Sequence, residues 1–142
     1  MSVLLAIQEQ CADRIRTDSL LEGVAVYTEK AADLGSQIEM ALGGMGLCVA
    51  VLTPSAVVGD PILPGPHLNP AYVVVRVMEN PRLNVGSRRA IEVAERVLVR
   101  LHQFKVDAAQ RPLTAASLSP SDSAPEDAIH YDVAFHTICV LS

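Results

Sequence analysis

The sequence contains few aromatic residues and no tryptophan: aromatic side chains make up 4% of its 142 residues, against 50% hydrophobic residues overall. Valine, leucine, isoleucine and alanine therefore have to build the core, and a chain of this length buries enough of them to fold without disulfides or metals. The scarcity of rings also argues against a surface that stacks nucleic-acid bases. We expect a single domain over residues 1–142 with an aliphatic core.

Positive charge is scarce as well. The formal net charge is -5, and the sequence pI is about 5.2. This balance disfavours non-specific binding to DNA or to an anionic membrane, because both need concentrated positive charge. The densest basic cluster, Arg88, Arg89, Arg96 and Arg100, is interspersed with glutamates. We interpret it as the solvated face of a helix and expect neither a specific nucleic acid nor a membrane as partner.

The three cysteines, Cys11, Cys48 and Cys139, are dispersed, and none belongs to a CxxC unit. Each lies in an apolar stretch, which indicates buried thiols in a reducing compartment. The apolar residues 1–7 are followed at once by polar residues and are too few for the core of a signal peptide or for a membrane span. We therefore expect a protein that is cytosolic when it is made.

Hydrophobic periodicity predicts eight elements in the order α-β-α-β-β-α-β-β. The helices are expected at 2–17, 33–42 and 87–106, and the strands at 23–29, 47–58, 71–79, 113–119 and 129–141. Because helices and strands do not alternate strictly, this order favours an α+β fold with a mainly antiparallel sheet of about five strands and the helices packed on one side. In the last strand, the alternate residues from Ile129 to Leu141 are predicted to face the core.

Two segments are predicted to be loops. Residues 59–70 contain four prolines and two glycines, which predicts an extended tip joining two antiparallel strands. Residues 119–127 are polar and contain further prolines. Long loops on compact domains often contact partners. The candidate interface residues come from the first loop: Pro61, Leu63, Pro64, Pro66, His67 and Leu68.

Two patterns resemble sites of chemistry, and each has a simpler structural interpretation. The run from Gly43 to Gly46 follows a predicted helix and precedes a strand, the reverse of a phosphate loop, and indicates a helix end and turn. His130 and His136 share one face of the last strand with Asp132, and such side chains bind metals. However, six residues of strand span roughly 20 Å, too far for one ion. We interpret them as a polar face.

His102, near the end of the long helix, could act as a general base, but no nucleophile motif such as GxSxG accompanies it. The presence of a histidine here is explained more simply by its favourable position near the negative end of the helix dipole. We expect no catalytic residue, no cofactor and no metal. The alternative is a small-molecule-binding or enzymatic domain in which folding gathers His102, His130, Asp132 and His136 around a pocket.

Polar residues separate the third strand from the long helix. Asn80 before Pro81 suits a turn, and Asn84 or Ser87 is expected to cap the helix. The strand ends in Val77-Met-Glu-Asn-Pro81, and the helix that follows closes on Leu101-His102. This arrangement resembles the tail-terminator proteins of long-tailed bacteriophages, most closely those of Mu-like phages.

The resemblance implies an α+β subunit without enzymatic activity that forms a hexameric ring. The ring would cap the finished tail tube, join it to the neck and, in contractile tails, hold the sheath. The protein would then be found in the virion tail after assembly in the host cytoplasm, with its own copies and the tube, neck and sheath proteins as partners. Another connector or baseplate subunit of a contractile machine is a further alternative.

Overall fold

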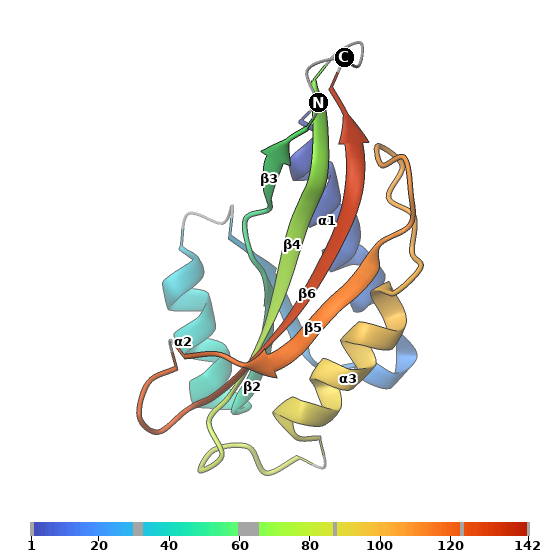
Figure 1. Ribbon diagram of the computed structural model, residues 1–142. Coiled ribbons are helices and arrows are strands. Elements are labelled where there is room, and N and C mark those ends of the chain that lie inside the picture. Colours follow the sequence, from blue (N-terminus) through green and yellow to red (C-terminus); the bar gives the residue numbers. More distant parts are fainter. Residues whose placement is uncertain (1, 30–32, 60–65, 87, 123, 142) are drawn as a thin grey trace.

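The structure, a computed structural model, describes residues 2–29, 33–59, 66–86, 88–122 and 124–141, and shows an α+β fold as expected (Figure 1). The helices are α1 (Val3–Arg16), α2 (Leu34–Gly44) and α3 (Ala90–Leu101), with a short 3₁₀ turn η1 (Ser19–Leu21). The strands are β1 (Ala25–Thr28), β2 (Leu47–Val51), β3 (Ser55–Val58), β4 (His67–Glu79), β5 (Thr114–Pro120) and β6 (Ile129–Val140). Within the described residues, no helix is long and apolar enough to cross a membrane.

The strands form one sheet in the order β1-β2-β4-β6-β5, with β3 also paired to β4. β1 and β2 are parallel, and the other neighbours are antiparallel. The long strands β4 and β6 lie side by side from Glu79 and Ile129 at one end to His67 and Val140 at the other. The prediction of a mainly antiparallel sheet is confirmed.

The single strand predicted over 47–58 is two strands, so the sheet has six strands rather than about five. β2 and β3 pair with β4 one after the other. The break falls at Pro54, which has no backbone N–H to give to a ladder. The predicted loop over 59–70 is also too long, because β4 begins at His67 and absorbs Pro70 at a register irregularity between Leu68 and Ala71.

The helices do not all lie on one side, contrary to the prediction. α1 and α3 pack together against one face of the sheet, where Ile15 and Leu101 join Phe135 in the main core. α2 packs on the opposite face, against Cys48 and Met78. The reason is visible in β2, in which all five residues are buried. A strand that is apolar at both alternating positions requires cover on both faces.

Three helix boundaries also differ from the prediction. α3 begins at Ala90 and ends before His102, so it is shorter than the 87–106 expected. α2 continues through Gly44 and is followed by Gly46 with a φ of 74°. Asp33 stands at its N-cap position without a side-chain capping bond.

The predicted core face of β6 is confirmed in its middle, and only its end residues, Ile129 and Leu141, are exposed.

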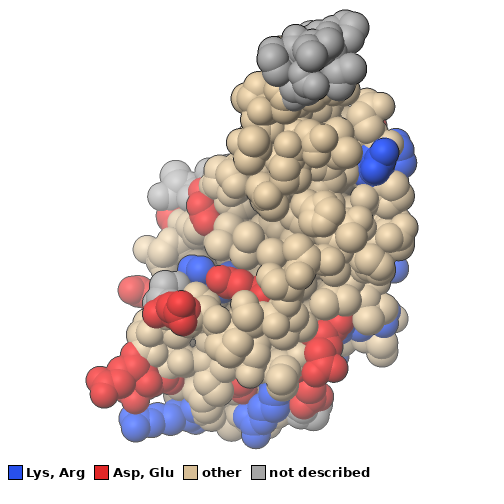
Figure 2. Space-filling model, in the orientation of Figure 1, with Lys and Arg blue, Asp and Glu red and all other residues tan. Residues whose placement is uncertain are grey.

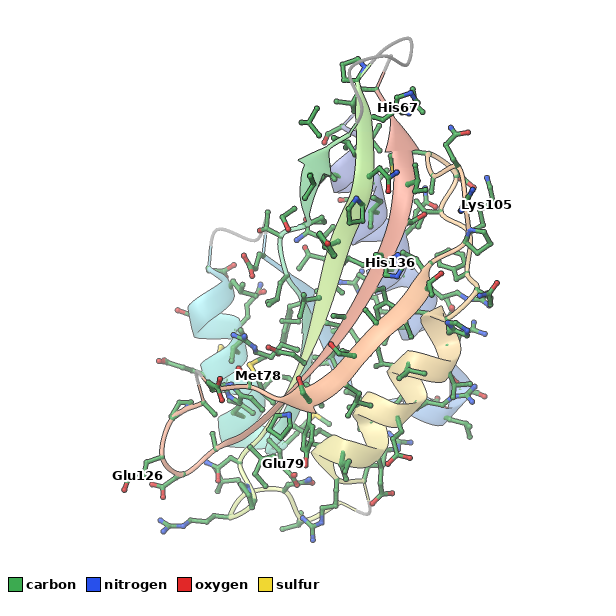
Figure 3. The ribbon with its side chains drawn as sticks, in the orientation of Figure 1. His67, Met78, Glu79, Lys105, Glu126 and His136 are labelled. Carbon is green, nitrogen blue, oxygen red and sulfur yellow. The ribbon has the colours of Figure 1, made fainter. Side chains whose placement is uncertain are left out.

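One part of the sheet surface is left partly open. Beyond α2, β4 and β6 present the side chains of Tyr72, Val74, Ala134, His136 and Ile138, the group called here the open sheet face. Tyr72 is 39% exposed, and His136 lies midway along the sheet (Figure 3). Charged side chains gather over the lower part of this side of the molecule and are sparse over the upper part (Figure 2).

Candidate functional site

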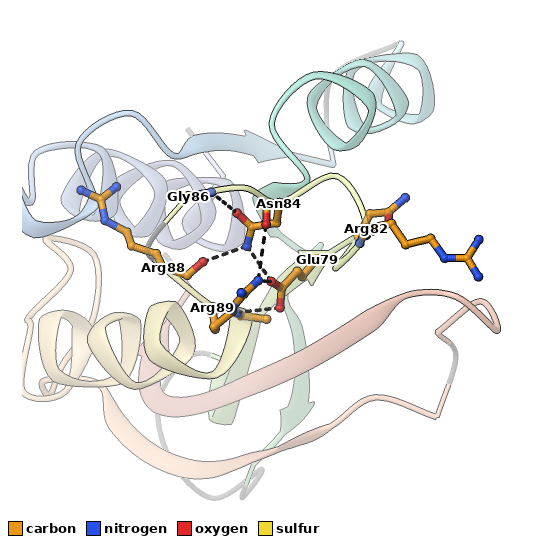
Figure 4. A network of polar contacts seen from close by, with 8 residues as sticks. Glu79, Arg82, Asn84, Gly86, Arg88 and Arg89 are labelled. Carbon is orange, nitrogen blue, oxygen red and sulfur yellow. Dashed lines mark hydrogen bonds and ion pairs between the residues drawn. The ribbon is translucent and has the colours of Figure 1, made fainter.

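A network of polar contacts lies between the end of β4 and the start of α3, and Glu79 is at its centre (Figure 4). Glu79 is 2% exposed. Its Oε1 accepts a hydrogen bond from the backbone nitrogen of Ala90 at 3.1 Å, and its Oε2 accepts from Asn84 Nδ2 and from Arg89 Nη1. A buried carboxylate is tolerated when donors surround it in this way.

Asn84 holds the connecting loop in shape. Its Nδ2 also donates to the carbonyl of Arg88 at 2.8 Å, and its Oδ1 accepts from Gly86 N at 3.2 Å. The helix cap predicted for Asn84 is therefore wrong in detail, because the first helical N–H is satisfied by Glu79 from the preceding strand. Ser87, the other predicted cap, lies outside the described residues.

Gly46 brings the end of α2 against this junction. Its φ of 74° suits glycine, and its carbonyl accepts from Asn80 N at 2.8 Å. A Cβ added at Gly46 would overlap the backbone nitrogen of Asn84. The glycine run therefore ends a helix, as predicted, and the last glycine also permits close backbone packing, which the sequence pattern did not reveal.

The arginine cluster is not a solvated helix face, contrary to the prediction. Arg96 Nε donates to Asp18 Oδ2 at 2.6 Å, and Asp18 is only 4% exposed. Arg100 Nε donates to the carbonyl of Arg14 at 3.1 Å, and Arg88 Nη1 to that of Glu22 at 2.6 Å. These side chains fasten α3 to α1 and to the segment around η1. The glutamates interspersed among them concealed this role in the sequence.

Asp18 is the acidic centre of that contact. Burial alone would raise the pKa of its carboxyl. The hydrogen bonds from Arg96 and from the backbone of Leu20, together with the positive charges of Arg96 and Arg100, outweigh burial and lower the pKa below its ordinary value. Asp18 is therefore ionised at neutral pH, and its stabilising contact with Arg96 depends on that charge.

The sheet separates the polar residues that a catalytic pocket would have to gather. His102 is on the helix side, where its Nδ1 accepts from Ala115 N at 3.1 Å. His130, Asp132 and His136 project from alternate positions of β6 that face away from the Phe135 core. The carboxylate of Asp132 accepts two hydrogen bonds from Arg76, at 2.8 and 3.1 Å. Among the described residues, no three His, Cys, Asp or Glu side chains could share a metal ion.

Burial is the main cause of the pKa shifts of His130 and of the three cysteines. Burial, assisted by the positive charge of Arg76, lowers the pKa of His130 despite the opposing charge of Asp132. Burial raises the pKa of the Cys11 thiol to about 12 and that of Cys48 to about 11. The three cysteines are buried, as predicted, and these raised pKa values make poor nucleophiles of the thiols.

The predicted interface residues fall into three groups. Pro61, Leu63 and Pro64 lie outside the described residues. Pro66 is exposed and His67 is partly exposed, at the end of the β4–β6 pair. Leu68 is a correction: it is 6% exposed and belongs to the core, so it offers no surface to a partner.

The comparisons with known proteins bear on the fold. No protein-family model matches the sequence, and no curated protein matches it. Among solved structures, a chain of the virion of a native gene transfer agent particle matches with a TM-score of 0.67 and 17% identity, over 99% of this chain and 100% of that chain. A second solved chain matches with a TM-score of 0.51 and 12% identity, over 97% of this chain and 92% of that chain. At these identities the likeness establishes a shared fold.

Proposed function

We propose that the protein is a structural subunit of a phage or phage-derived particle, and specifically a tail terminator that forms a ring at the end of the tail tube. The observation that carries the proposal is the fold shared over its full length with a chain of a gene transfer agent virion. The proposal assigns to this chain the role of a particle component, like the chain whose fold it shares. It is a hypothesis because fold alone does not determine function.

The residues behind the resemblance to tail terminators support the same conclusion, since each has a definite structural task. Glu79 and Asn84 build the junction in front of α3. Leu101 is fully buried, and His102 joins the end of α3 to β5. A motif whose members hold the fold together is expected to persist among proteins that share an architecture and differ in most other positions.

The surface supports assembly. The open sheet face combines tyrosine, histidine and aliphatic side chains, and the charged residues on this side of the molecule gather over its lower part (Figure 2). Depletion of charge is typical of the centre of interfaces between proteins. The proposed partners are further copies in a hexamer, with the tail tube, the neck and, in a contractile tail, the sheath; the proposed location is the virion tail.

The enzymatic alternative is disfavoured by a specific arrangement, the position of His102 on the other side of the sheet from His130, Asp132 and His136. A connector or baseplate subunit of a contractile machine would fit the same fold and the same surface. It differs from a terminator in where the ring binds, which makes binding to a tube end the distinguishing property.

The proposal is tested by measuring the mass in solution by light scattering over a concentration series and imaging the particles by negative stain. A closed ring of six copies with an open centre is the expected result. A protein that stays monomeric throughout and binds a small molecule in a pocket would contradict the proposal.

A further inference from the structure

The open sheet face lacks the helical cover that the rest of the sheet has. α1 and α3 pack on the opposite side of the same strands, and α1 lies behind β4 and β6 in Figure 1. α2 is on the same side as the open sheet face but packs against the part of the sheet around Cys48 and Met78. Tyr72 is consequently 39% exposed. Because a sheet in an α+β domain normally buries its apolar surface under helices, this part of the sheet can take a further helix.

The charged groups on this side stand at the border of the open sheet face. Arg76 and Asp132 are the next residues of the same side along β4 and β6, and they bond each other at 2.8 Å. Glu29, just after β1, adds a second negative charge near Arg76. Within the open sheet face, Tyr72 and His136 are paired neighbours whose hydroxyl and imidazole groups can donate hydrogen bonds. A complementary partner is therefore apolar and brings an acceptor between its apolar groups.

The outer side of α3 has this character. Of the three described α-helices, α3 alone presents two large exposed apolar side chains, Ile91 at 43% and Val99 at 61%. Glu95 lies one helical turn from each, so the three side chains share one face of the helix, and Glu92 adjoins them. Within the described residues neither glutamate forms an ion pair. The arginines of α3 are bonded instead to Asp18 and to a carbonyl of α1.

The two surfaces also match in size. A helix is roughly 10 Å wide, enough to cover two strands that lie about 4.8 Å apart. Ile91 and Val99 are separated by about 12 Å along the helix axis. Ala134 and Ile138, at the two ends of the open sheet face on β6, are separated by about 13 Å along the strand. Apolar contacts can therefore form on either side of His136.

We propose that α3 of one copy packs across the open sheet face of a second copy, with Glu95 accepting a hydrogen bond from His136 between two apolar contacts. The inference rests on the proposed ring-forming function and names the two surfaces that join neighbouring subunits. α3 and the open sheet face lie on opposite sides of the sheet, so the contact is head-to-tail. A head-to-tail contact repeats from copy to copy and closes into a ring when the rotation allows it.

Cross-linking tests the pairing of the two surfaces, because Cys11, Cys48 and Cys139 are 0% exposed and will not react readily. One variant carries Val99→Cys and another carries Ala134→Cys. The two are mixed at equal concentration and treated with a short bismaleimide, which joins two thiols. We expect the mixed dimer to exceed either homodimer roughly tenfold. A single chain that carries both substitutions should give a ladder of products that ends at the hexamer.

A charge placed on each of two exposed helix positions tests the contact without cross-linking. Val99→Glu should weaken association in light scattering roughly tenfold or more, because it would bury a second carboxylate one turn from Glu95. Met40→Glu is the matched control, since Met40 is 76% exposed on α2 and lies outside the proposed contact; it should associate as the unmodified protein does. Equal weakening in both variants would show that α3 is not the contacting surface.

A double-mutant cycle tests the polar pair itself. Glu95→Ala and His136→Ala are measured singly and together by light scattering. If the two side chains meet, the double variant should associate roughly threefold or more better than the product of the single effects predicts. Independent effects would show that Glu95 and His136 do not meet.

The outcomes separate this contact from the proposed function. A ring that forms without the mixed cross-link, while Val99→Glu associates as the unmodified protein does, would overturn the contact and leave the proposed function standing. Cross-linking of Ala134→Cys to itself in place of the mixed product would show that two sheet faces meet across a two-fold axis, which also overturns it. If the unmodified protein stays monomeric at every concentration, the contact and the ring-forming function fail together.

Discussion

The two faces of the sheet are made by the same strands and are used differently. Toward α1 and α3, Val75, Val133 and Phe135 are fully buried. On the other side, their neighbours Val74, Ala134 and His136 remain partly exposed, and α2 covers only the part of the face around Met78. Because strand residues alternate between faces, one sequence can place its stability on one side and leave the other side available for contact.

The largest expected effect comes from neighbouring residues of β6 that point to opposite faces. Phe135→Ala should lower the free energy of unfolding by about 3–5 kcal/mol, because it removes a fully buried ring and leaves a cavity. His136→Ala should change it by no more than about 0.5 kcal/mol. Urea unfolding followed by circular dichroism measures both. Equal losses would contradict the division of roles between the two faces.

The second comparison concerns two arginine–aspartate pairs that differ in burial, one on each face of the sheet. Asp18→Asn removes the buried partner of Arg96 on the helix side and should cost about 3 kcal/mol. Asp132→Asn removes the partner of Arg76 on the other face, where both side chains are about one quarter exposed. It should cost about 1 kcal/mol because solvent screens the pair. The urea midpoints of the two variants measure which loses more stability. A larger loss in Asp132→Asn would show that the pair on the helix side of the sheet is not the more important one for stability.

The lowered pKa of Asp18 also predicts a dependence on pH. The folded pKa lies below the unfolded value, so the stabilisation is present above an unfolded pKa of about 3.9 and is lost as the pH falls through the folded pKa. Between about pH 5 and pH 2, stability should therefore fall less steeply in Asp18→Asn than in the unmodified protein. Parallel acid profiles would mean that other carboxylates dominate the response.

Sequence patterns predicted an element correctly where a single hydrophobic period runs through most of its length. The alternation in β6 predicted its core residues, and the apolar stripe of α3 predicted its presence, because a half-buried element repeats its pattern over many residues. The placement of α2 was missed because its apolar stripe shows which side of the helix is covered and does not indicate which face of the sheet it packs on. The clue was β2, whose uninterrupted apolar residues signal burial on both sides.

The polar contacts were harder to predict because they join segments far apart in sequence. Arg96 meets Asp18 across 78 positions, and no local pattern connects them. Glu79 caps α3 from 11 residues away, so a search for a cap immediately before the helix selected Asn84 and Ser87 instead. An apolar hollow lined by Met45, Leu47 and Val85 also escaped prediction, because Met45 and Val85 come from separate loops and look like isolated exposed residues in the sequence.

A smaller effect is expected in α2, the helix on the less covered side. Gly43→Ala should stabilise the protein by about 0.5 kcal/mol, because alanine favours a helix and a Cβ at Gly43 meets no atom within 4 Å. Gly46→Ala is the contrasting variant and should destabilise it, since its Cβ would overlap Asn84. Thermal unfolding distinguishes them. A loss of stability in Gly43→Ala would indicate that α2 packs more tightly than its single buried residue, Ala41, suggests.

The smallest expected effect is the contribution of His130 to the pH dependence of stability. Burial and the charge of Arg76 lower its folded pKa below the unfolded value of about 6.5, so the unfolded chain binds the proton more readily. Stability should be complete above pH 6.5 and decline as the pH falls from there toward the folded pKa. His130→Gln should flatten this decline by about 0.3 kcal/mol or less, because the ring is partly exposed and solvent screens its charge. Urea titrations at pH 7 and pH 5 measure the difference. A steeper decline in the variant would mean that protonated His130 is stabilised by Asp132 more than it is opposed by Arg76.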